Sequence, residues 1–206
     1  MPMDLAELAR PEHTAVLLQE CQEGVIGPRS VLPELARVAR EEMIPKIAAL
    51  TRAARGAGVR VVHCLAVPRA DGFGRHRNAP LFVAAHRSAN RLAEGSPGVE
   101  VAAGLEVGPD DLVLTRMQGL TPFLHSELDP ILRNEGVRTI VACGVSLNVA
   151  IPALTFEAVS AGYSVVIPRD AVAGVPRDYG RAVLDHSLRA VATLAASDDL
   201  VALWNG

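Results

Sequence analysis

Short apolar runs alternate with longer segments of helical period along this chain. The runs have the length of β-strands, and the longer segments place apolar residues three or four positions apart, as on one face of a helix. Such alternation is typical of a parallel sheet covered by helices on both faces. The predicted strands are Thr14–Leu18, Val59–Leu65, Asp111–Thr115, Arg138–Cys143 and Tyr163–Pro168. The predicted helices span about residues 32–57, 81–92 and 127–133, the last capped by Ser126.

The C-terminal part of the pattern allows two interpretations. Residues 190–196 either continue the helix that runs through Asp185 or form a short sixth strand, and we favour the strand. Ser197, Asp198 and Asp199 offer an N-cap and an acidic first turn, which predict a closing helix over Leu200–Trp204. We therefore expect one α/β domain over residues 1–206, with three layers and a mainly parallel, six-stranded sheet at the centre.

Length and composition are those of one globular domain. With 206 residues and 50% hydrophobic positions, the chain can bury a large core and is too short for two ordinary domains. A net charge of -3, with scattered Lys and Arg, gives no field that favours nucleic acid or an anionic membrane. Aromatic residues make up 3%, too few for a surface on which bases stack. A small, near-neutral molecule is the partner that these values favour.

The N-terminal residues and the cysteines indicate the cytoplasm. Acidic residues stand where a signal peptide would carry basic ones, and no apolar run reaches the roughly 20 residues of a membrane span. We therefore expect a soluble, cytoplasmic protein that does not enter a membrane. Cys21, Cys64 and Cys143 are an odd number without paired spacing, so we expect reduced, mostly buried thiols.

Candidate chemistry gathers at the ends of three predicted strands, because ligands of open parallel sheets bind beyond the carboxyl ends of the strands. The first strand is followed by Gln19-Glu20-Cys21-Gln22, and the third by Arg116-Met117-Gln118. The fourth passes through Gly144 into Val145-Ser146-Leu147-Asn148-Val149-Ala150, a tight turn that begins a helix. Many α/β enzymes place a nucleophile in this turn, and alanine cannot be one.

The order and spacing of these strand ends resemble the isochorismatase-like hydrolase family, which includes nicotinamidases, carbamoyl-amide hydrolases and isochorismatases. The family's Asp-Met-Gln corresponds to Glu20-Cys21-Gln22, its lysine to Arg116, and its Ser-Ala-Phe to Thr121-Pro122-Phe123. Its Gly-Val-x-Thr-x-x-Cys-Val corresponds to residues 144–151, with Ala150 at the place of the cysteine. The resemblance spans almost the whole chain. It implies a Rossmann-like fold and a homo-oligomer.

The resemblance also implies a mechanism that needs three side chains. In the family, a cysteine thiolate at a helix N-terminus attacks an amide carbonyl, helped by a lysine cation, while an aspartate transfers the proton. Backbone amides beside a cis peptide after the fourth strand stabilise the oxyanion. Carried over by position, the triad becomes Glu20, Arg116 and Ala150. The residues expected to contact a ligand are Val145, Ser146, Val149, Phe123 and Gln22, with the Pro68–Pro80 loop as a further wall.

All three triad positions depart from the family pattern. Glu20 keeps the carboxylate but moves it by one methylene, and Arg116 keeps the charge of lysine without its titration. Ala150 removes the nucleophile, a loss that costs about a millionfold in rate in a well-studied hydrolase. Thiol-based amide hydrolysis is therefore not expected.

Two functions remain open. In the first, the chain binds a small molecule, and a carboxylate suits both the Arg116 cation and the amides at the helix N-terminus. In the second, Glu20 acts as general acid or base without a cysteine, as in the isochorismatases, which cleave a vinyl ether in this way. The permanent cation at Arg116 counts against the second, because it favours the ionised carboxylate.

Other residues offer weaker alternatives. Cys21 or Cys143 could replace the missing nucleophile, although Cys143 is expected to point into the sheet packing and Cys21 away from Glu20. Ser146 lacks the second glycine of a nucleophile elbow and is interpreted as a turn residue or helix cap. We expect no metal, because the histidines form no ligand motif, and no dinucleotide cofactor, because the first strand lacks a Gly-x-Gly-x-x-Gly turn.

Overall fold

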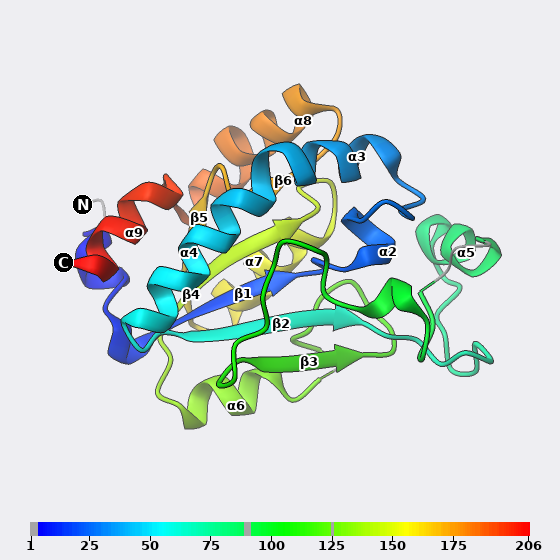
Figure 1. Ribbon diagram of the computed structural model, residues 1–206, viewed down its shortest axis with the longest axis horizontal. Helices are drawn as coiled ribbons and strands as arrows, with labels where there is room; N and C mark the ends of the chain where they lie inside the picture. The colour runs from blue at the N-terminus through cyan, green and yellow to red at the C-terminus, as the bar shows by residue number, and fades with distance from the viewer. Residues whose placement is uncertain (1–3, 89–91, 125) are drawn as a thin grey trace.

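The computed structural model describes residues 4–88, 92–124 and 126–206. Within these residues, a central sheet of seven strands has the order β3-β2-β1-β4-β5-β7, with the short β6 paired to β4. All strand pairs of the sheet are parallel, so the carboxyl ends lie at one edge (Figure 1). The strands are β1 Thr14–Gln19, β2 Arg60–Ala66, β3 Leu112–Arg116, β4 Thr139–Val145, β5 Ser164–Pro168, β6 Val172–Ala173 and β7 Thr193–Ala195.

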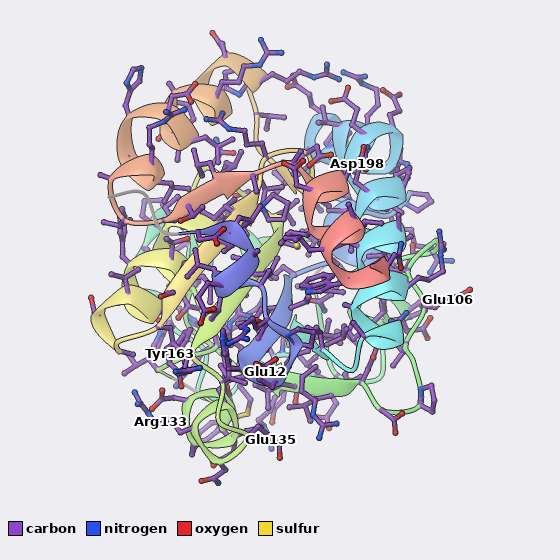
Figure 2. All side chains as sticks on the ribbon, turned by 90° about the vertical axis from the view of Figure 1, so that its left-hand side faces the viewer. Glu12, Glu106, Arg133, Glu135, Tyr163 and Asp198 are labelled. Carbon is purple, nitrogen blue, oxygen red and sulfur yellow. The ribbon has the colours of Figure 1, made fainter. Side chains whose placement is uncertain are left out.

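Helices cover both faces of this sheet, which gives the three layers expected from the sequence. In Figure 2, α4 and α9 lie side by side on one face, and α6 and α7 lie on the other. The first face carries α1 Leu5–Leu8, α3 Pro33–Val38, α4 Ile44–Gly56 and α9 Ser197–Asn205. The second carries α6 Leu128–Asn134, α7 Ala150–Ser160 and, with the turns that follow it, α8 Arg177–Ala182. Two short helices, α2 Glu23–Ile26 and α5 Pro80–Arg87, lie beyond the carboxyl ends of the strands (Figure 1).

The alternation of side chains along the strands builds two apolar cores, because successive strand residues point to opposite faces. In β1, Val16 and Leu18 belong to the core under α4 and α9, and Ala15 and Leu17 belong to the core under α7. All four are buried, as expected for a central strand that is covered on both faces. Trp204 of α9 closes the first core, and its Nε1 donates a hydrogen bond of 2.7 Å to the Ala9 carbonyl.

The five strands predicted from apolar runs are confirmed to within two residues at each end. Residues 193–195 form β7, so the strand interpretation of the tail is correct. The sequence does not predict β6, because a strand of two residues is too short to show a period. The sheet therefore has one strand more than the six expected.

The predicted helices are present with changed ends. The run over residues 32–57 is continuous, with a π-helical turn at Ala39–Met43 just before Pro45, which has no amide hydrogen to donate. The helix predicted to reach Leu92 ends at Arg87, and residues 89–91 of that range lie outside the described residues. The helix predicted over 127–133 begins at Leu128, so Glu127 and not Ser126 is its N-cap residue, although Ser126 Oγ accepts a hydrogen bond of 3.2 Å from the Leu128 amide.

The closing helix begins earlier than predicted, at Ser197. The Ser197 hydroxyl donates to Asp170 at 2.7 Å and is therefore not the N-cap. Instead, the Asp199 carboxylate accepts a hydrogen bond of 3.2 Å from the Ala196 amide, which stabilises the first turn. In the part of the chain that the structure describes, the helices are all too short or too polar to cross a membrane.

Candidate functional site

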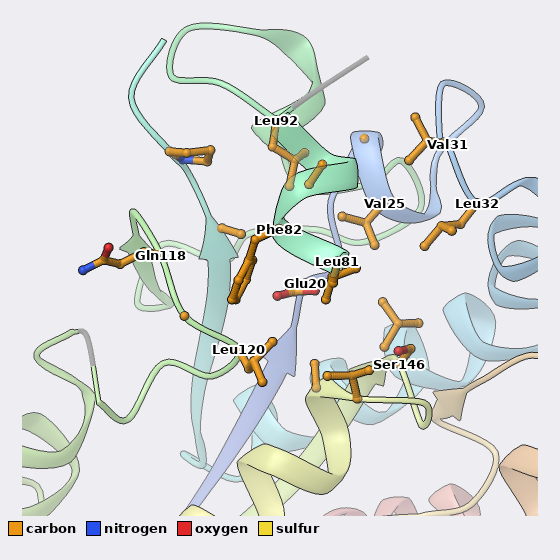
Figure 3. A pocket seen from close by; sticks show the side chains of 18 of the residues that line it. Glu20, Val25, Val31, Leu32, Leu81, Phe82, Leu92, Gln118, Leu120 and Ser146 are labelled. Atoms are coloured by element: carbon orange, nitrogen blue, oxygen red, sulfur yellow. The ribbon is translucent and has the colours of Figure 1, made fainter. Parts of the chain in front are cut away.

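A cavity opens beyond the carboxyl ends of β1, β3 and β4, the edge at which the sequence places candidate chemistry (Figure 3). Its volume is about 410 Å³, within the roughly 300–1,000 Å³ of small-molecule sites. Glu20, Arg116 and Ala150 all line it. The strand order explains why these distant residues meet, because β1 lies between β2 and β4, and β3 pairs with β2.

Glu20 is the first residue after β1, and its backbone adopts the left-handed conformation with a φ of 53°. Its amide donates a hydrogen bond of 3.0 Å to the Cys64 carbonyl of β2. A positive φ is uncommon for a residue with a Cβ atom. The carboxylate lies within the cavity, between Leu81 and Phe82 on one side and Leu120 on the other (Figure 3), and the side chain is 22% exposed.

Arg116 is the buried cation of the site, with 3% of its surface exposed. Its Nη2 donates to Glu20 Oε1 in a close ion pair and lies 3.5 Å from the Leu120 carbonyl oxygen. Its Nε and Nη1 are buried and have no hydrogen-bond partner among the described residues. Buried donors normally find an acceptor, so these two nitrogens are unsatisfied hydrogen-bond donors next to the cavity.

The turn after β4 brings α7 close to Glu20. Gly144 has a φ of 106°, and a Cβ atom at this position would lie 2.3 Å from the Gln19 carbonyl oxygen, so only glycine allows this approach. The Val145–Ser146 peptide bond is cis. Asn148 anchors the turn: its Nδ2 donates to the Val175 carbonyl at 2.5 Å, and its Oδ1 accepts from the Val175 amide at 3.0 Å.

Ala150 is the first residue of α7 and lines the cavity. The first amides of a helix have no acceptor within the helix and carry a partial positive charge. The site therefore combines a carboxylate, a guanidinium and a helix N-terminus around a methyl group. The methyl side chain of Ala150 cannot attack a carbonyl carbon.

The three cysteines are buried in the protein core and do not line the cavity. All three are free and buried, as expected from the sequence. Burial raises the pKa of Cys21 and Cys143 and raises that of Cys64 to about 12. Thiols of this kind stay protonated at neutral pH and are poor nucleophiles.

Three of the five expected ligand contacts, Val145, Ser146 and Val149, line the cavity. The other two, Gln22 and Phe123, do not line it. Gln22 is fully buried and is held by backbone, since its Oε1 accepts from the Ala66 amide at 2.8 Å. The Phe123 ring packs against Tyr163, with 5.8 Å between ring centroids, so it serves the α6 and α7 side of the sheet.

One wall of the cavity was not predicted. Leu81, Phe82 and Ala85 of α5 line it, and their spacing on one helix face is the signal in the sequence that identifies them. From the loop expected as a wall, Pro68, Arg75 and His76 take part. The remaining apolar lining comes from segments whose role the sequence did not indicate, among them Val31, Leu32, Met117 and Leu120.

A buried charged cluster lies outside the cavity, between β2 and the start of β3. Asp111 Oδ2 lies 2.9 Å from His63 Nε2 and 2.7 Å from Arg55 Nη2. Burial alone would raise the pKa of Asp111, but hydrogen bonds from Arg55, the Gly108 amide and His63 lower it overall. Burial lowers the pKa of His63 by more than its bond to Asp111 raises it. Among residues 4–88, 92–124 and 126–206, no three His, Cys, Asp or Glu side chains lie together as metal ligands would.

Comparisons with known proteins bear on the family and the fold. A family model described as the isochorismatase domain matches residues 14–199. Among curated proteins, the phenazine biosynthesis protein PhzD1 of Pseudomonas aeruginosa is 29% identical over 102 residues, which are 50% of this chain and 49% of that protein. The chain thus spans about half the length of this relative.

Solved structures extend the similarity over the whole chain. A cysteine hydrolase from Pseudomonas syringae pv. phaseolicola is 24% identical, with a TM-score of 0.84 over 100% of this chain and 95% of its own. An isochorismatase family protein from Desulfovibrio vulgaris subsp. vulgaris is also 24% identical, with a TM-score of 0.79 over 93% of this chain and 99% of its own. At this level of identity, the two structures establish a shared fold.

Proposed function

The chain belongs to the isochorismatase family, and from that premise we propose that its cavity binds a small carboxylate without thiol-based hydrolysis. One observation carries the proposal: Ala150 lines the cavity beside Glu20 and Arg116, where the family resemblance implies a nucleophilic cysteine. The loss of a nucleophile removes about a millionfold in rate from a hydrolase of known mechanism. What remains at this position is a cavity with binding groups and no attacking atom.

The charges of the lining support a carboxylate ligand. Two guanidinium groups, those of Arg75 and Arg116, and one carboxylate, that of Glu20, line the cavity, so its formal charge is positive. The Arg116 Nη2 is bonded to Glu20, and its Nε and Nη1 are buried without a hydrogen-bond partner among the described residues, so a ligand carboxylate would bind Arg116 after a small shift of its side chain. At the start of α7, the Ile151 amide donates to the Ser146 carbonyl at 3.0 Å and Pro152 has no amide hydrogen, so the Ala150 amide and the helix dipole supply the partial positive charge. Guanidinium groups bind carboxylates through paired hydrogen bonds, and a helix N-terminus favours the same ligand.

A relocated thiol is not supported. Cys21 and Cys143 are the two candidates closest in sequence to the strand ends, and both are fully buried in the core under α4. Burial raises the pKa of each thiol well above its usual range. Neither sulfur reaches the cavity, so neither is placed to attack a bound substrate.

A second candidate function is acid–base catalysis by Glu20 without a cysteine. The observation that favours it is the distribution of contacts on the carboxylate. Arg116 and Gln19 both donate to Oε1, whereas Oε2 has no hydrogen bond to the described residues. A free carboxylate oxygen in this cavity can accept a proton from a bound substrate.

One experiment separates the two functions. The native protein and its Glu20→Gln variant are assayed for turnover of isochorismate, nicotinamide and N-carbamoyl amino acids, and for thermal stabilisation by acetate and phenylacetate. We expect stabilisation by the carboxylates and no turnover. Turnover that Glu20→Gln abolishes would reject the binding-only function and support the second candidate. Glu34→Gln, an exposed carboxylate of α3, is the matched control.

Two further proposals concern assembly, for which the family resemblance implies a homo-oligomer, and location, for which the free, buried cysteines favour the cytoplasm. We propose that the chain assembles as a homo-oligomer and that it works in the cytoplasm. Light scattering on the purified protein gives the first, and a monomer at micromolar concentration would reject it. Fractionation of cells that produce the protein tests the second.

A further inference from the structure

We propose that the carboxylate taken by this cavity carries an apolar body, an aryl ring or a branched alkyl group, held between α5 and the segment 25–35. This inference rests on the proposed function, which supplies the carboxylate end. It adds the chemical class of the rest of the ligand. It also names Phe82 and Leu81 as residues that determine specificity.

Helix α5 provides the first part of the argument, because it has no buried residue of its own. Its apolar side chains at Leu81, Phe82 and Ala85 all line the cavity rather than a protein core. Leu81 is 50% exposed. An amphipathic helix is normally held by burial of its apolar face. An apolar molecule in the cavity would cover the part of this face that remains exposed.

The walls around α5 have the same character. Large apolar side chains that remain substantially exposed converge on this one cavity: Val31, Leu32, Leu81, Met117, Leu120 and Val149. They come from the α2–α3 connection, α5, the segment after β3 and the turn before α7. Scattered exposed leucines are ordinary, but apolar groups gathered around a concave site mark a surface that binds apolar matter.

The position of the charged groups sets the orientation of the ligand. Glu20, Arg116 and Ser146 come from the carboxyl ends of β1, β3 and β4, at the sheet end of the cavity. Figure 3 shows Leu81 and Phe82 beside Glu20, and Val25, Val31 and Leu32 farther from the strand ends. A carboxylate at Arg116 therefore directs the body of the ligand toward the apolar side chains. Hydroxyl groups on that body would lie against leucine, valine and phenylalanine without partners, at a loss of roughly tenfold in affinity each.

The test is calorimetric titration of the full-length protein with matched probes. Acetate, phenylacetate, 3-phenylpropionate and 4-phenylbutyrate share the carboxylate and differ in apolar surface. We expect phenylacetate to bind at least tenfold more tightly than acetate, and each added methylene that is buried to contribute about fourfold. 3,4-Dihydroxyphenylacetate should bind at least tenfold more weakly than phenylacetate.

Variants of the apolar wall complete the test. Phe82→Ala should weaken phenylacetate about tenfold and change acetate by less than twofold. Phe73→Ala, a change of the same side chain at a site that is 78% exposed and does not line the cavity, should alter neither. Because α5 contributes no buried residue, Phe82→Ala is expected to fold, and its circular dichroism spectrum verifies this.

The outcomes distinguish this inference from the proposed function. Equal affinity for acetate and phenylacetate, equal affinity for the dihydroxylated probe, or an unchanged Phe82→Ala variant would overturn the apolar body and leave the carboxylate end in place. Equal affinity for phenylacetate and its uncharged amide, phenylacetamide, would overturn the carboxylate end and leave the apolar site. Absence of saturable binding by every phenyl probe would overturn both.

Discussion

Gln19 and Arg116 donate hydrogen bonds to the same two acceptors, Glu20 Oε1 and the Leu120 carbonyl oxygen. Gln19 Nε2 lies 3.3 Å from the carboxylate oxygen and 3.4 Å from the carbonyl oxygen, and Arg116 Nη2 lies 3.5 Å from the same carbonyl. Gln19 is fully buried at the end of β1. The shared acceptors join the ends of β1 and β3 to the segment 117–120, which forms one wall of the cavity.

The two donors should contribute unequally to ligand binding. Arg116→Met should weaken phenylacetate at least tenfold, because a hydrogen bond to a charged group contributes about 1.5–3 kcal/mol. Gln19→Leu removes a neutral donor that makes only long hydrogen bonds, so binding should change by less than about threefold. Calorimetric titration measures both. Arg52→Met, at an exposed arginine of α4, is the control, and an Arg116→Met variant that binds like the native protein would refute the assigned anion site.

Restoring a thiol at position 150 should produce a reactive cysteine. Ala150→Cys places the sulfur at the N-terminus of α7 and in the cavity lined by Arg116, and both favour the thiolate. Iodoacetamide should label this variant in the folded state, whereas the native protein should be labelled only after unfolding, because its cysteines are buried.

The control for this labelling is Ala85→Cys, which also lines the cavity but lies inside α5, away from its N-terminus. Its labelling rate should rise with pH as for an ordinary thiol, with a midpoint near 8.5. That of Ala150→Cys should rise at lower pH. If the Ala150→Cys sulfur resists iodoacetamide as the buried cysteines do, the cavity does not open above α7.

The fold could be predicted because most of its strands are long apolar runs, which can be recognised without knowing which strands they pair with. A central strand such as β1 is buried on both faces, so the run is continuous and its position is unambiguous. β6 could not be predicted in this way, because it consists of Val172 and Ala173 alone, which pair with β4. The start of α9 also depends on tertiary contact, because Asp170 binds Ser197 and leaves the capping role to Asp199.

The candidate site could be predicted only in part. Strand ends of a parallel sheet meet at one edge, which is why Glu20, Arg116 and Ala150 could be grouped before any coordinates. The position of α5 depends on the path of the loop before it, which no local pattern determines. Phe123 lies near Arg116 in sequence but packs against Tyr163, an interaction between segments 40 residues apart that only the fold reveals.

Acid should destabilise the protein through His63. Burial lowers the pKa of this side chain in the folded state, so the unfolded chain binds more protons as the pH falls below about 6.5. The stabilising contribution is therefore complete above that pH and is lost as the pH falls toward the lowered pKa. We expect the free energy of unfolding, measured in urea, to fall by about 1 kcal/mol for each unit by which the two pKa values differ.

Two histidine variants test this assignment. His63→Leu removes the titrating group and should flatten the stability profile between pH 7 and pH 5. His186→Gln, at an exposed histidine, should keep the native slope. Below about pH 4 a second loss should appear in every variant that retains Asp111, since the pKa of this carboxyl is lowered in the folded state. A native slope in His63→Leu would assign the pH dependence to another group.

Gly144 should be required mainly because β4 approaches β1 closely at the cavity, and less because of its positive φ. Gly144→Ala forces a positive φ on alanine and places the new Cβ 2.3 Å from the Gln19 carbonyl oxygen. Gly136→Ala is the matched control, because Gly136 also has a positive φ, of 71°, but an added Cβ would meet nothing within 4 Å. The control should lose about 1 kcal/mol of stability in urea, and Gly144→Ala about 3 kcal/mol.

Gly144→Ala should also weaken phenylacetate binding, since the ends of β1 and β4 that carry Glu20 and Ser146 must move apart. Equal losses in the two variants would mean that the backbone angle alone, and not the contact with Gln19, requires glycine after Cys143.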